Sequence, residues 1–148
     1  MAAGLSMTED NFDAFVERIT SLANAQLSVD DLQKVVRIDT HLQPNEATAE
    51  SALALQQLAP FGRGNAQPRL LVQGAKIGKS SLFGKGQRKF LSLSLRLGSD
   101  KVLDAVWWDG ERFKDELPEG RVVDVVGTLA MDSYTRRQRF TVQDIAVT

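Results

Sequence analysis

The hydrophobic and polar positions follow two different repeats along the chain. In residues 8–26 and 46–59, apolar side chains recur at three- and four-residue steps, which predicts two helices. Between them, residues 34–42 alternate and are rich in β-branched side chains, so they are expected to form a strand that ends before Pro44. Helix, strand and helix in so short a stretch indicate a fragment of an α/β layer, too thin to complete its own core.

In the second part of the chain the repeat changes to a period of two. Five alternating runs predict five strands, at residues 69–77, 89–98, 101–109, 121–131 and 139–147. Apolar residues at four-residue spacing between the third and fourth runs predict one or two helical turns. This order is typical of an oligonucleotide/oligosaccharide-binding (OB) barrel. We therefore expect an α+β chain, a helix–strand–helix fragment followed by a five-stranded antiparallel OB-fold barrel. A small sandwich or an SH3-like barrel is the competing fold.

A stretch rich in turn-forming residues, 61–68, separates the two patterns. Gly62 and Gly64 permit backbone angles that other residues avoid, and Asn65 and Pro68 favour turns. The stretch is expected to redirect the chain from helix into barrel. The expected division is a fragment at 1–60, a glycine-rich junction at 61–68 and an OB domain at 69–148.

The formal net charge of −1 conceals an uneven distribution of charge. Residues 1–60 hold three basic against nine acidic side chains, whereas residues 61–148 hold fifteen basic against ten acidic ones. Residues 61–89 carry seven basic side chains and no acidic one. A basic half of this kind indicates a polyanionic partner. A solvated surface on which basic residues happen to cluster is the alternative.

The residue types give little support to catalysis or metal binding. The chain has no cysteine, which excludes disulfides and thiolate metal sites and fits a reducing compartment. It has one histidine, His41, and its carboxylates are scattered singly, so a two-metal phosphodiesterase centre cannot be assembled. The stretch GAKIGKSS, residues 74–81, is one residue too short for a phosphate loop. With no secretory signal and no apolar run long enough to cross a membrane, we expect a cytoplasmic chain without a cofactor or catalytic residues of its own.

Two loops of the predicted barrel concentrate cations and aromatic rings. Residues 78–90 are expected to join the first two strands and residues 132–140 the last two, and OB barrels bind single strands with these loops and the face between them. Neighbouring residues of a strand point to opposite faces, so Trp107 is assigned to the core and Trp108 to the outside. The residues predicted to contact single-stranded DNA are Arg63, Arg69, Lys76, Lys79, Lys85, Arg88, Lys89, Trp108, Tyr134, Arg136, Arg137 and Arg139.

The stretch LAPFGRGNAQP is similar to a Leu-x-Pro-Phe-Gly-x-Gly-Asn-x-x-Pro signature of the RecJ family, bacterial exonucleases that degrade single-stranded DNA. The matching positions are Leu58, Pro60, Phe61, Gly62, Gly64, Asn65 and Pro68. MAAGL, residues 1–5, resembles the end of a Gly-Gly-His-x-Met-Ala-Ala-Gly motif in that family's DHH-associated domain. LDAVWW, VDVVGTL and VQDI resemble strands of its barrel, so the resemblance covers essentially the whole chain.

The resemblance implies the C-terminal piece of such an enzyme, with the end of the DHH-associated domain followed by the OB domain. The family's metal-binding Asp-His-His motif is not in this sequence, so hydrolysis and its Mn²⁺ or Mg²⁺ would belong to an upstream nuclease core. The implied function is to bind and guide single-stranded DNA for 5′→3′ degradation in DNA repair and recombination. Two alternatives are a module that docks an acidic peptide tail, such as that of a single-strand-binding protein, and a purely architectural brace.

Overall fold

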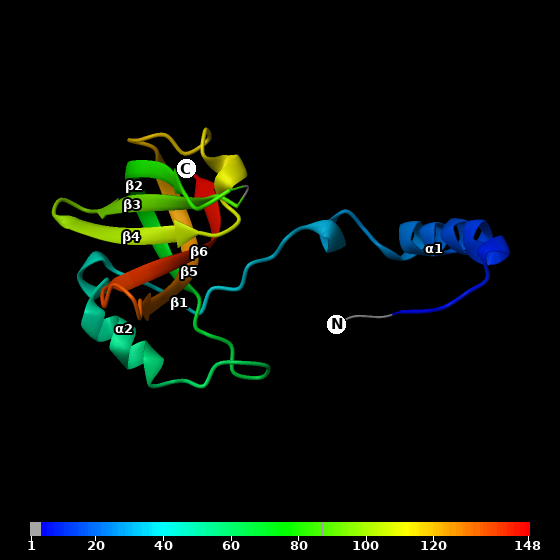
Figure 1. Ribbon diagram of the computed structural model, residues 1–148, viewed down its shortest axis with the longest axis horizontal. Coiled ribbons are helices and arrows are strands. Elements are labelled where there is room, and N and C mark those ends of the chain that lie inside the picture. Colours follow the sequence, from blue (N-terminus) through cyan, green and yellow to red (C-terminus); the bar gives the residue numbers. More distant parts are fainter. Residues whose placement is uncertain (1–3, 87) are drawn as a thin grey trace. The chain divides into compact units, whose positions relative to one another are not determined.

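The computed structural model describes residues 4–86 and 88–148 of the chain (Figure 1). It contains two compact units, one that ends at Val35 and one that runs from Val36 to Thr148. The first unit holds helix α1 (Phe12–Gln26), which follows a 3-10 turn at Glu9–Asn11, so the first predicted helix is confirmed. The assignment of residues 1–60 to a DHH-associated domain stays a prediction.

The second unit is built on the five predicted strands. They are β2 (Leu70–Phe83), β3 (Phe90–Leu97), β4 (Lys101–Trp107), β5 (Val122–Met131) and β6 (Gln138–Val147). In the sheet order β2-β3-β4-β6-β5, strand β5 also pairs with β2, which closes the barrel. The predicted OB-like barrel is thereby confirmed. Most of its inward positions are aliphatic or aromatic, and Leu91, Leu95, Leu103 and Phe140 are completely buried.

One pair of barrel strands is parallel, which differs from the all-antiparallel expectation. Strands β4 and β6 run in the same direction, with Ala105 opposite Phe140, whereas the other four pairs of the barrel are antiparallel. The reason is the connection after β4, which crosses one end of the barrel and delivers β5 to the far edge of β2. Strand β6 then returns beside β4 in the direction of β4.

Strand β2 is longer than its alternation predicted. Leu70–Lys76 pair with β5 and Lys76–Phe83 pair with β3, so one strand serves both neighbours. The predicted loop at 78–90 is therefore wrong over its first half, because residues 78–83 continue the strand, and of the described residues only 84–86 and 88–89 lie between the two strands. Glycine and serine hide the continuation in the sequence, since they add no hydrophobic signal.

Two short elements cover the ends of the barrel (Figure 1). Helix α2 (Ala49–Gln56) packs on β5 and buries Ala52 completely, and its N-cap Thr48 accepts a hydrogen bond from the Ser51 N–H. At the other end, the predicted helical turns are a 3-10 turn, Glu111–Phe113, followed by the buried Leu117.

The strand predicted at 34–42 is reduced to β1 (Thr40–His41), which pairs in parallel with β2. No helix within the described residues is long and apolar enough to cross a membrane.

Candidate nucleic-acid interface

The outer face of β2, β3 and β4 carries a row of three aromatic rings. Phe83 and Phe90 are opposite each other in the strand register, and their ring centroids lie 5.5 Å apart. Trp108 follows the last residue of β4 and meets Phe90 edge to face, with centroids 4.8 Å apart and planes at 81°. Phe83 and Trp108 remain 42% and 41% exposed. We call these three side chains the aromatic row.

The next row on the same face holds small side chains. Ser81 lies opposite Ser92, Ser92 opposite Val106, and Val106 opposite Thr141, so the row crosses four strands. These side chains are half-buried or buried and do not stand above the sheet as the rings do. A chain of nucleotides lying across the strands would therefore contact the rings of the aromatic row and, next to them, a flat surface of short side chains.

Two further rows bring charge onto this face. Lys79 lies opposite Ser94, which lies opposite Asp104, and in the last row Lys76 lies opposite Arg96. Ser94 and Arg96 alternate with the buried leucines of β3, so their side chains point outward. The residues opposite them on β2 and β4 point to the same face. The outer face thus changes from aromatic to basic along the direction of the strands.

Beside the aromatic row lies an open cleft of about 810 Å³. One wall is the turn between β2 and β3, and the other is the segment that follows β4. We call this feature the cleft, and its lining residues are Arg88, Lys89, Phe90, Trp108, Asp109, Glu111 and Arg112.

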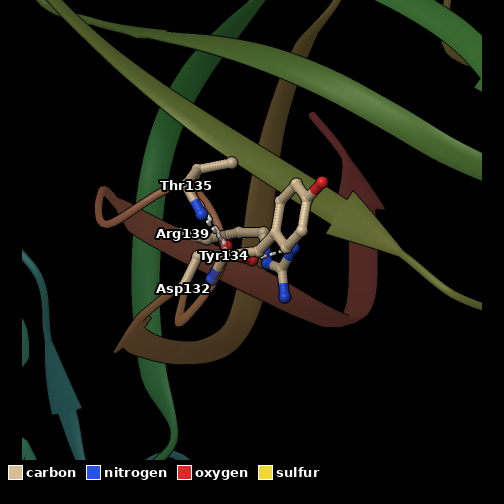
Figure 2. Close-up of polar contacts among 4 residues, drawn as sticks. All are labelled: Asp132, Tyr134, Thr135 and Arg139. Carbon is tan, nitrogen blue, oxygen red and sulfur yellow. Dashed lines mark hydrogen bonds and ion pairs between the residues drawn. The ribbon is translucent and has the colours of Figure 1, made fainter.

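The turn between β5 and β6 is built around the carboxylate of Asp132 (Figure 2). Its Oδ1 atom accepts hydrogen bonds from the backbone N–H of Tyr134 at 2.9 Å, from the N–H of Thr135 at 2.6 Å, and from the Thr135 hydroxyl at 3.0 Å. Its Oδ2 atom pairs with the guanidinium of Arg139. The hydrogen bond from the Thr135 N–H is the main cause that lowers the pKa of Asp132, and the Arg139 charge lowers it further, while burial opposes both.

Arg139 connects this turn to the aromatic row. The carbon of its guanidinium lies 5.8 Å from the centre of the Trp108 ring, within the range of a cation–π contact. The cation is therefore held by a carboxylate and faces a ring that is open to solvent. At the tip of the same turn Tyr134 is 95% exposed, so its side chain extends into solvent, and Arg136 has a φ of 53°.

A sequence profile described as RecJ OB domain matches residues 38–144. This chain belongs to the RecJ family. It is 24% identical over 149 residues to the single-stranded-DNA-specific exonuclease RecJ of Bacillus subtilis (strain 168), a match that covers 99% of this chain and 19% of that protein. It is 38% identical over 87 residues to the RecJ exonuclease of Dickeya dadantii (strain 3937), a match that covers 55% of this chain and 15% of that protein.

A solved RecJ structure shares the fold. The crystal structure of RecJ from Thermus thermophilus in complex with Mn²⁺ matches 98% of this chain and 20% of its own, with a TM-score of 0.68 and 22% identity. The chain thus spans about a fifth of the length of the RecJ proteins that match nearly all of it. The family resemblance inferred from the glycine-rich stretch is confirmed.

The RecJ-family barrel brings four of the predicted contact residues together. Arg88, Lys89 and Trp108 line the cleft, and Arg139 lies over the Trp108 ring. The outward position predicted for Trp108 and the core position predicted for Trp107, which is 7% exposed, are both confirmed. The other predicted residues on this part of the barrel are Lys76 and Lys79 on the outer face of β2, Lys85 in the turn after it, and Tyr134, Arg136 and Arg137 in the turn after β5.

Two predicted residues lie elsewhere. Arg69 immediately precedes β2, at the opposite end of that strand from Phe83, and its N–H donates to the Asp39 carboxylate. Arg63 lies in a tight turn in which Gly62 and Asn65 exchange backbone hydrogen bonds. Neither residue lines the cleft, so the basic charge of residues 61–89 does not converge on one site.

The sequence reasoning missed several residues of the interface. Phe90 falls within the strand predicted at 89–98 and is absent from the predicted contact residues, yet it is the centre of the aromatic row. Arg112 lines the cleft and lies 4.6 Å from the centre of the Phe113 ring, although it was expected only in a structural turn. The alternation of β3 would have placed Phe90 outward with Ser92 and Ser94.

The described residues do not fit a resident metal ion. Among them, no three histidine, aspartate or glutamate side chains come close enough together to hold one. The Mn²⁺ or Mg²⁺ implied for a whole RecJ enzyme therefore has no ligand set in this part of the chain, and no chemical step is assigned to these residues.

Proposed function

We propose that this chain binds single-stranded DNA on its OB barrel and guides it toward the nuclease core of a RecJ-like exonuclease. The observation that carries the proposal is the aromatic row beside a cleft whose lining includes the cations of Arg88, Lys89 and Arg112. Solvent-exposed rings next to basic side chains are what a protein needs to hold bases and phosphates of an unpaired strand at once.

Each part of the interface has a separate role in this proposal. Bases stack on Phe83, Phe90 and Trp108, and stacking contributes about 1–3 kcal/mol per base without regard to sequence. Phosphates are neutralised by Arg88 and Lys89 in the cleft wall and by Lys79 on the face. The turn that carries Tyr134, Arg136 and Arg137 closes over the strand from the side of Arg139.

Hydrolysis belongs elsewhere in this proposal. The relatives are named as single-stranded-DNA-specific exonucleases, and this chain spans about a fifth of the B. subtilis protein. We infer that a nuclease core using Mn²⁺ or Mg²⁺ performs the 5′→3′ degradation, and that the barrel keeps the substrate engaged during DNA repair and recombination. The acidic tail of a single-strand-binding protein would compete for the same cations.

The test is a titration of a labelled single-stranded oligonucleotide with the 148-residue chain, followed by fluorescence anisotropy at low and at raised salt. We expect binding at low salt that weakens steeply as the salt concentration rises, because bound counterions are released. A duplex of the same sequence should bind more weakly, since its bases cannot stack on the rings. Absence of single-strand binding at low salt would refute the proposal, and an acidic peptide that binds where DNA does not would favour the docking alternative.

A further inference from the structure

The cleft differs from a simple phosphate site in the charges of its walls. Besides the cations of Arg88, Lys89 and Arg112, it is lined by the carboxylates of Asp109 and Glu111. Within the described residues, none of these five groups forms an ion pair with another side chain. The cleft therefore offers free hydrogen-bond acceptors and free donors next to two aromatic rings.

The wall that carries the carboxylates is fixed against the barrel. Phe113 stacks on the buried Trp107 with ring centroids 4.6 Å apart and planes at 3°. The N–H of Gly110 donates to the Trp107 carbonyl, and the N–H of Phe113 donates to the Gly110 carbonyl. A Cβ atom on Gly110 would come within 2.8 Å of the Trp107 side chain, so the backbone lies directly on the core. Asp109 and Glu111 flank this anchored glycine, which gives them a defined position at the cleft.

Carboxylates in such a place need an explanation, because they repel the phosphates that the cations attract. A base edge, unlike a phosphate, presents both donors and acceptors. Bases of a single strand are read on their exposed edges by hydrogen bonds while their faces stack on aromatic rings. The mixture of Asp109, Glu111 and Arg112 beside Phe90 matches a base edge better than it matches a phosphate.

We propose that the cleft reads the edge of one base and favours bases that carry an exocyclic amino group. The carboxylates of Asp109 and Glu111 accept from the amino group, as carboxylates accept from N4 of cytosine. Uracil and thymine present a carbonyl oxygen at that position, which faces the carboxylates as a second acceptor. Arg112 donates to the O2 carbonyl that all pyrimidines share, so discrimination falls on the carboxylates. This inference rests on the proposed single-strand binding.

The experiment compares labelled oligodeoxycytidine with oligodeoxyuridine of equal length, because these bases differ only on one edge, in the group at position 4 and in the proton on N3. Titrations use the 148-residue chain at neutral pH and moderate salt. We expect cytidine to bind about three- to tenfold more tightly, the value of one net hydrogen bond. Equal affinity of the two strands overturns the inference and leaves the proposed function intact, whereas absence of binding to both overturns the proposed function itself.

Two variants test whether the preference for cytidine arises in the cleft. The double variant Asp109→Asn, Glu111→Gln should bind both strands more tightly, because two negative charges are removed, and should lose most of the preference for cytidine. Asp104→Asn is the matched control, since that carboxylate lies on the same face in the row of Lys79 and outside the cleft. It should tighten both strands alike and keep the preference. A preference that survives in the double variant, or that disappears in the control, overturns the inference.

Discussion

The guanidinium of Arg139 pairs with the carboxylate of Asp132 across the tight turn between β5 and β6. The Asp132 side chain is only 6% exposed, whereas Arg139 is 37% exposed. One carboxylate therefore shapes the turn through backbone hydrogen bonds and also holds the cation that faces Trp108. The turn and the aromatic row are coupled through this pair.

Replacement of Asp132 by asparagine is expected to reduce the acid sensitivity of the fold. The pKa of Asp132 is lowered from its ordinary value of 3.8, chiefly by the hydrogen bond from the Thr135 N–H. A carboxylate with a lowered folded pKa stabilises the fold fully above its unfolded pKa, and this stability is lost as pH falls through the folded pKa. Wild type should lose stability below about pH 4 more steeply than Asp132→Asn, which should be less stable than wild type at about pH 7.

Thermal unfolding at stepped pH between neutral and strongly acidic values measures this difference. Asp100→Asn, in the turn between β3 and β4, is the control and should follow the wild-type curve. Parallel curves for Asp132→Asn and wild type would show that the carboxylate contributes nothing to the acid response.

Alanine substitutions of the neighbours Trp107 and Trp108 should have different effects, one on the stability of the fold and the other on single-strand binding. Trp108→Ala removes an exposed ring, so we expect little change in the unfolding temperature and a loss of single-strand affinity of about fivefold or more. Trp107→Ala removes a buried ring stacked on Phe113, and large-to-small core substitutions of this kind cost about 3–5 kcal/mol of stability. Calorimetry and anisotropy on both variants give the comparison. Unchanged affinity in a well-folded Trp108→Ala would remove this ring from the binding surface.

The different outcomes of these two tryptophans show what the sequence can predict. Alternation along a strand decides which of two neighbours faces the core, and the neighbours Leu103 and Ala105 were sufficient to assign Trp107 inward. The five strands were predictable for the same reason. The length of β2 was not, because Gly78, Ser80 and Ser81 carry no hydrophobic alternation and are held in the strand by pairing with β3.

The candidate site was predictable only in part, since a basic run along the chain does not show where each cation goes. Arg69 and Lys89 belong to the same run, yet one precedes β2 and the other lines the cleft beyond its far end. The length of strand β2 separates these two residues. The role of Arg112 depends on a ring contact with Phe113 that no spacing rule reveals.

Loss of a cation from the cleft wall should reduce the salt dependence of binding. For single strands the slope of log affinity against log salt changes by about 0.7 for each phosphate contact. Arg88→Ala and Lys89→Ala should each make the slope shallower by up to this amount. Lys101→Ala is the control, because Lys101 is exposed at the start of β4, opposite Leu97, and is not part of the cleft. A full wild-type slope in both cleft variants would argue against phosphate contacts at these positions.

Two glycines of the turn between β2 and β3 should respond very differently to alanine. Gly84 has a φ of 131°, and a Cβ atom there would lie 2.2 Å from the Arg88 carbonyl oxygen. Gly86 has a φ of 63°, and among the described residues beyond its chain neighbours no heavy atom lies within 4 Å of the added Cβ, so Gly86→Ala should cost only about 1–2 kcal/mol. Gly84→Ala must displace the backbone that carries Arg88, and single-strand affinity should therefore fall more than in Gly86→Ala at equal net charge. Anisotropy and thermal unfolding of both variants test this, and equal affinities would mean that the geometry of the turn does not matter for binding.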